Sequence, residues 1–126
     1  RSENSIYEFM RTHQLEERLK PMLQDHIEIV SERTGKAIRR GTLILYSIKE
    51  FYVTLIIKTA KGETKQYHMP FPFDFELFDD RLVMDYKLQH VYQTKSALED
   101  IVNELGESKS PFYDNTINVC RQKRTK

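Results

Sequence analysis

Carboxylate side chains form the densest group in this sequence that could do chemistry. Residues 74–85 contain one base and five acids, which are Asp74, Glu76, Asp79, Asp80 and Asp85. Such a cluster could bind a divalent cation, or two members could act as a carboxylate pair. Adjacent side chains on a strand point to opposite faces, so Asp79 and Asp80 converge only if the backbone turns there. We therefore favour a capping turn on an acidic surface over a metal site.

The other residue types that commonly do chemistry are scattered. The four histidines have neither the spacing of metal ligands nor a neighbouring cysteine, and they are His13, His26, His68 and His90. The four glycines are isolated, which excludes a glycine-rich phosphate loop. Cys120 is the single cysteine, so no internal disulfide can form, and this indicates a reducing, intracellular compartment. We predict that the chain is not an enzyme and binds no cofactor or metal.

The charge is nearly balanced but unevenly distributed. The 126 residues include 20 Lys and Arg and 19 Asp and Glu, for a formal charge of +1. Residues 31–65 hold eight bases and three acids, and the tail from Arg121 to Lys126 holds four bases and no acid. No apolar run approaches the roughly 20 residues of a membrane span, and the polar start does not resemble a signal peptide. We expect unlike surfaces on one soluble domain.

The N-terminal quarter shows helical periodicity. Between residues 6 and 30 one apolar row advances in steps of four and three residues, through Leu15, Leu19, Met22, His26 and Ile29. A second row contains Leu23, Ile27 and Val30. Pro21 indicates that a helix begins near Lys20 or bends there. These eight side chains either cover the chain's own sheet or form an interface with a partner helix, as in a coiled coil.

The centre of the sequence is rich in strand-forming residues. Residues 42–48 and 51–59 are dense in β-branched and aromatic side chains, and residues 66–69 return as a partner strand after a turn at Gly62. Pro70 and Pro72 predict an edge position, and the alternation over residues 71–77 indicates a strand with one buried face. After Asp80, either a short helix over 81–84 or a strand over 82–92 fits the pattern. A capped helix is expected over 96–105, ended by Gly106.

These elements predict an α+β fold. It has an N-terminal amphipathic, coiled-coil-type helix, a small antiparallel β-sheet or half-sandwich, and a short C-terminal helix. Residues 1–106 are expected to form one helix-plus-sheet domain, and residues 107–126 a peripheral segment with a basic tail.

One segment resembles a known family. Residues 71–84 read FPFDFELFDDRLVM, similar to a signature of the dimerisation-partner (DP) subunits of heterodimeric cell-cycle transcription factors. The matching positions are Phe71, Phe75, Glu76, Leu77, Asp79, Asp80, Val83 and Met84. The resemblance implies a coiled-coil helix followed by a small β domain that pairs with the other subunit in the nucleus, under control of a pocket protein. DNA would be read by a separate winged-helix domain.

The leading hypothesis is therefore a non-catalytic protein–protein interaction domain, which pairs with another subunit or with a second copy through the helix. Another coiled-coil-linked assembly or scaffold domain is a related possibility. The alternative is a nucleic-acid-binding module in which lysines and the basic tail hold phosphates and bases stack on strand tyrosines. Those tyrosines are Tyr46, Tyr52, Tyr67, Tyr86 and Tyr92.

Overall fold

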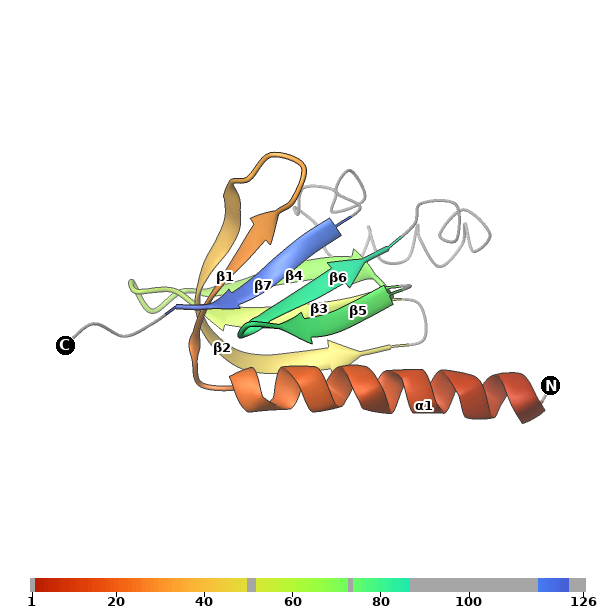
Figure 1. Cartoon of the computed structure of the whole chain (residues 1–126). Coiled ribbons are helices and arrows are strands. Elements are labelled where there is room, and N and C mark those ends of the chain that lie inside the picture. Colours follow the sequence, from red (N-terminus) through yellow and green to blue (C-terminus); the bar gives the residue numbers. More distant parts are fainter. Residues whose placement is uncertain (1, 50–51, 73, 87–115, 123–126) are drawn as a thin grey trace.

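The computed structural model describes residues 2–49, 52–72, 74–86 and 116–122 (Figure 1). Helix α1 (Ser2–Leu19) is followed by a 3-10 turn, η1 (Lys20–Met22), and seven strands are present in this described part. The strands are β1 (His26–Ser31), β2 (Ala37–Ile48), β3 (Tyr52–Lys58), β4 (Thr64–Pro70), β5 (Asp74–Phe78), β6 (Arg81–Asp85) and β7 (Thr116–Arg121).

The described strands form one antiparallel sheet in the order β4-β3-β2-β1-β7-β6-β5. β4 and β5 are therefore its two edges, yet only residues 71–73 connect them. A flat sheet of this width would separate its edges by about 29 Å at ~4.8 Å per strand, whereas the connection reaches about 15 Å at most. The sheet must roll so that its edges approach each other, which gives it a concave and a convex face.

Local features of β2 allow the sheet to bend. The register between β2 and β3 shifts between Leu43 and Leu45, which indicates a β-bulge. At Gly41, a Cβ atom would clash with the Ile57 side chain and the Lys58 backbone, so the two strands approach more closely than a side chain allows. The bulge and the glycine both lie in β2, the longest described strand.

The core lies between the concave face and α1. Alternate residues of the strands point inward, among them Ile27, Leu55 and Val119, which are fully buried. Leu15 and Leu19 of α1 are also fully buried against them.

Polar contacts fix the helix on two strands that lie far apart in the sheet order. On the β2 side, the Tyr46 hydroxyl donates to Glu16 Oε2 at 3.2 Å. On the β5 side, the Arg11 guanidinium lies 4.7 Å from the centre of the Phe75 ring and donates to the Pro72 carbonyl at 3.4 Å. Because α1 contacts both β2 and β5, it bridges the rolled sheet and closes its concave side (Figure 1).

The predicted fold class is wrong, because the described chain is mainly an antiparallel sheet with one N-terminal helix. The helix is not of coiled-coil type, since it stops at Leu19 and residues 26–31 form β1. The chain reverses at Gln24, whose φ is 71°, and Gln24 N donates to the Leu43 carbonyl at 2.7 Å. The apolar rows from Leu15 to Val30 thus combine a helical repeat before the turn with a strand repeat after it.

Other expectations fare differently. The antiparallel sheet is confirmed, and residues 61–63 turn between β3 and β4. Residues 116–121 were expected in a peripheral segment. They form β7, an interior strand that lies between β1 and β6. The predicted helix over 96–105 lies outside the described residues. No helix in the described part is long and apolar enough to cross a membrane.

The buried position of Leu19 leads to a first prediction. Leu19→Ala should lower the free energy of unfolding by about 2–5 kcal/mol, because it removes a fully buried side chain from the contact between helix and sheet. Urea unfolding followed by circular dichroism measures this loss. Gln14→Ala is the control, since Gln14 is exposed on the same helix. Equal midpoints for the two variants would contradict the packing of α1 into the sheet.

Candidate functional site

The family-like segment folds as the β5–β6 hairpin. Asp79 and Asp80 form its two-residue turn, with φ angles of 56° and 63°. Positive φ at both central positions is the mark of a type I′ turn, whose twist matches that of the paired strands. Aspartate tolerates this conformation better than most residues. A turn is present at this point as predicted, but it closes a hairpin and caps no helix, since residues 81–85 follow it as a strand.

Seven of the eight motif residues are dispersed over this hairpin, and Phe71 lies in the connection before it. Glu76 and Leu77 are exposed on β5, whereas Met84 is fully buried on β6. Phe71, Phe75 and Val83 are half-buried, and Asp79 and Asp80 are exposed in the turn. The motif thus describes a local hairpin with one buried face and does not bring its side chains to one site.

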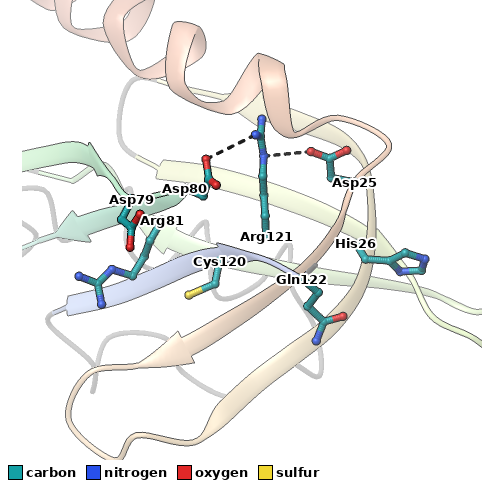
Figure 2. Close-up of a pocket in the computed structure, with 8 residues that line it drawn as sticks. All are labelled: Asp25, His26, Asp79, Asp80, Arg81, Cys120, Arg121 and Gln122. Atoms are coloured by element: carbon teal, nitrogen blue, oxygen red, sulfur yellow. Dashed lines mark ion pairs between the residues drawn. The ribbon is translucent and has the colours of Figure 1, made fainter. Parts of the chain in front are cut away.

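The turn lies beside a hollow with a volume of about 560 Å³ (Figure 2). Its lining comes from the starts of β1 and β6 and the end of β7, and consists of Asp25, His26, Asp79, Asp80, Arg81, Cys120, Arg121 and Gln122. The fold therefore brings Asp79 and Asp80 close to His26 and Cys120, which are distant from them in sequence.

Arg121 occupies the centre of this group. Its Nε lies 3.0 Å from Asp25 Oδ2 and its Nη1 lies 3.8 Å from Asp80 Oδ1 (Figure 2). Its Nη2 also donates to the Pro21 carbonyl at 2.7 Å. The guanidinium therefore joins the end of β7 to the turn after α1 and to the β5–β6 turn. Because these contacts engage all three of its nitrogens, Arg121 is better placed to hold the fold than to bind an anion.

Cys120 is not activated as a nucleophile. Burial raises the pKa of its thiol and Glu28 adds to the rise, whereas the Arg81 guanidinium opposes it. Its side chain and that of His26 lie apart in the hollow and do not point toward each other (Figure 2). A thiol needs a lowered pKa or an adjacent base to attack a substrate at neutral pH. This hollow therefore has no nucleophile–base pair.

Metal binding has no better support from the described residues. No group of three or more histidine, cysteine, aspartate or glutamate side chains converges there on one point. His26 is exposed, with its Nδ1 3.4 Å from Thr42 Oγ1. His68 lies on another strand, with its Nδ1 2.9 Å from Thr54 Oγ1 and its Nε2 2.8 Å from Gln66 Oε1.

The residues predicted as a partner interface lie mostly inside the molecule. Five of the eight are fully or almost fully buried in the core: Leu15, Leu19, Met22, Ile27 and Ile29. Leu23 and Val30 are half-buried, and His26 is exposed. The buried five hold α1 against the sheet and have no surface left for a partner helix.

Sequence reasoning missed a different apolar surface, on the outer side of α1. Ile6, Phe9 and Met10 are 59%, 71% and 51% exposed. Their spacing of three and four residues places them on one face of the helix. That spacing was visible in the sequence, but the stronger row that begins at Leu15 obscured it. We call these three residues the outer ridge.

The tyrosines proposed for base stacking are largely used by the fold. Tyr67 and Tyr86 are buried, and Tyr46 points to the concave face, where it bonds to Glu16. Tyr52 is half-buried beside His68, with ring centroids 6.3 Å apart. Tyr92 lies outside the described residues. The described tyrosines do not form an exposed stacking platform.

No protein-family model, curated protein or solved structure matches this chain. The DP resemblance of residues 71–84 therefore stays a prediction.

The type I′ turn gives a second prediction. Asp79→Asn combined with Asp80→Gly should raise the free energy of unfolding by about 0.5–1 kcal/mol, because asparagine and glycine suit positive φ better. The lost contact with Arg121 is long and Asp80 is 71% exposed, so its removal should cost little. Asp80→Val is the opposing variant and should lower the free energy of unfolding by about 1–3 kcal/mol. Chemical denaturation that gave the reverse order of stability would contradict this turn geometry.

The raised pKa of Cys120 gives a third prediction. Alkylation of the folded protein by iodoacetamide at pH 8 should be slower than alkylation of the same protein in urea. Only the thiolate reacts, and a raised pKa leaves less thiolate at this pH. The rate in the folded protein should continue to increase above the ordinary pKa of about 8.5. Mass spectrometry measures the modified fraction, and equal rates in both states would refute the prediction.

Proposed function

We propose that this chain is a non-catalytic protein-interaction domain that binds an apolar helix of a partner protein on the outer ridge of α1. The exposure of Ile6, Phe9 and Met10 is the observation that carries this proposal. Large apolar side chains grouped on one exposed face commonly mark a binding surface, whereas single ones do not.

The outer ridge is separate from the helix face that holds the fold. Ile6 precedes Leu15 by nine residues, which is about two and a half turns, so the two side chains lie on opposite sides of α1. Leu15 is fully buried against the sheet, and Ile6 therefore points away from it. A partner can cover the ridge without opening the core.

The surroundings of the ridge favour a helical partner. Phe9 stacks on the His13 ring, with centroids 6.4 Å apart and an interplanar angle of 10°. His13 Nε2 lies 3.7 Å from Glu17 Oε2 in the next turn. The apolar residues are thus continued by a polar pair along the same face. A ridge at helical spacing with a polar border fits the groove between side chains of a second helix.

The first partner to test is the other subunit of a DP-type heterodimer, in keeping with the resemblance of residues 71–84 and with a nuclear role. Nucleic-acid binding receives no support from the tyrosines of the described chain, so we do not propose it.

A substitution within the ridge tests the proposed function. Phe9→Asp should weaken partner binding about 30-fold or more, since a central aromatic residue in a buried contact commonly contributes at least ~2 kcal/mol. Co-purification from cells would identify partners that the wild-type chain retains and the variant loses, and calorimetry with the purified partner would give the affinity. Ala60→Asp is the control, because it adds the same charge at an exposed position in the turn between β3 and β4, outside α1.

Two results would overturn the proposal. One is that Phe9→Asp retains the same partners at the same affinity as Ala60→Asp. The other is that Phe9→Asp destabilises the isolated chain as strongly as Leu19→Ala, which would place Phe9 in the fold.

A further inference from the structure

A second surface lies at the edge of the sheet, on residues other than those of the outer ridge. β5 pairs with β6 on one side, and no described strand pairs with its other side. A free edge presents unpaired N–H and C=O groups that another extended chain can join. Figure 1 shows β5, in dark green, at the margin of the sheet.

The hairpin register indicates which backbone groups face outward. Phe78 and Arg81 flank the two-residue turn, so this pair exchanges hydrogen bonds within the hairpin. Hydrogen-bonded pairs alternate along an antiparallel ladder, so Phe75 and Leu77 direct their N–H and C=O groups away from β6. An added strand would bond to these two residues.

The side chains of β5 specify what such a strand should carry. Asp74, Glu76 and Phe78 share one face of the strand and are all exposed, Phe78 by 57%. Leu77 points to the other face and is 50% exposed. The edge therefore combines two carboxylates with two large apolar groups over five residues.

The other edge strand is less suited to this role. In β4, the side chains of Tyr67, His68, Met69 and Pro70 are all buried, and Pro70 has no N–H to donate. The exposed half of β4 carries Lys65, whose Nζ lies 3.7 Å from Glu63 Oε1. The two edges thus differ in both accessibility and charge.

We propose that β5 binds an extended, basic and apolar segment of a partner protein by strand addition. Lys or Arg side chains of the segment lie opposite Asp74 and Glu76, and apolar side chains lie opposite Leu77 and Phe78. The same charges act against pairing between two copies of β5, since the carboxylates of both copies would lie together. This site uses no residue of the outer ridge, so either surface can bind independently of the other.

A peptide provides the direct test. The probe is a fluorescein-labelled, N-acetylated Val-Ile-Lys-Thr-Lys amide, which places its apolar residues opposite Phe78 and Leu77 when it runs antiparallel to β5. The same residues in reverse order serve for the parallel orientation. At low salt, one of the two should bind in fluorescence anisotropy, and it should shift the amide NMR signals of Phe75 and Leu77. A version with glutamate in place of both lysines should not bind.

Variants of the protein separate this site from general charge attraction. Asp74→Lys combined with Glu76→Lys should weaken peptide binding about tenfold or more, since two favourable charge pairs become repulsive. Glu17→Lys combined with Glu63→Lys changes the net charge equally at exposed positions away from β5 and should leave the affinity unchanged. Leu77→Pro removes an outward N–H and should also abolish binding, with circular dichroism to verify that the fold is kept.

Several outcomes would overturn the proposal. These are that neither lysine peptide binds, that the glutamate peptide binds equally well, or that both double variants weaken binding equally. Sedimentation that shows self-association lost only in the Asp74 and Glu76 variant would assign the edge to a second copy of the chain instead. If the unaltered chain binds neither lysine peptide but retains the helical partner, this site is refuted and the proposed function stays intact.

Discussion

The short connection between β4 and β5 is the constraint on which the rest of this structure depends. It joins the two edges of a seven-stranded sheet among the described residues, and three residues cannot span such a sheet if it is flat. Rolling creates a concave face whose apolar side chains need cover. α1 fills this space, and its contacts reach Tyr46 on β2 and Phe75 on β5. The bulge near Leu43, the close approach at Gly41 and the buried leucines of α1 all follow from the same requirement.

The helix consequently has two faces with different tasks. Its inner face, with Leu15 and Leu19, belongs to the core. A partner helix could reach this face only if α1 separated from the sheet. Its outer face carries Phe9, whose side chain is 71% exposed. Arg121 lies beyond the C-terminal end of α1. It joins β7 to the turn after the helix through Asp25 and the Pro21 carbonyl. The polar hollow around Arg121 is therefore part of the support of the fold, and the surfaces with unsatisfied apolar area lie elsewhere.

Sequence reasoning recovered the local features of this fold better than the long-range ones. The turns at Gly62 and at Asp79–Asp80 depend on residues close in sequence, and both were predictable. The end of the helix was not, because Met22, His26 and Ile29 continue the helical steps of Leu15 and Leu19 by coincidence. Only the hydrogen bonds from Gln24 and Leu43 across the turn show that β1 begins there. The position of β7 between β1 and β6 was equally hidden, since no local pattern encodes which strands a segment pairs with. For the same reason, the grouping of Asp25, Asp80 and Arg121 could not be read from their spacing.

The central position of β7 has a consequence for how the chain folds. Residue Ile27, near the start, pairs with Arg121, near the end, and β7 is the only described strand that joins β1 to β6. Before β7 is added, β1 to β4 form one group and the β5–β6 hairpin forms another, each with an unpaired side. Pairings between residues so distant in sequence close large loops and are slow to form. During synthesis on the ribosome, the two groups are therefore complete long before the strand that unites them emerges. In that interval the sides of β1 and β6 that later pair with β7 are open to pairing with other extended chains.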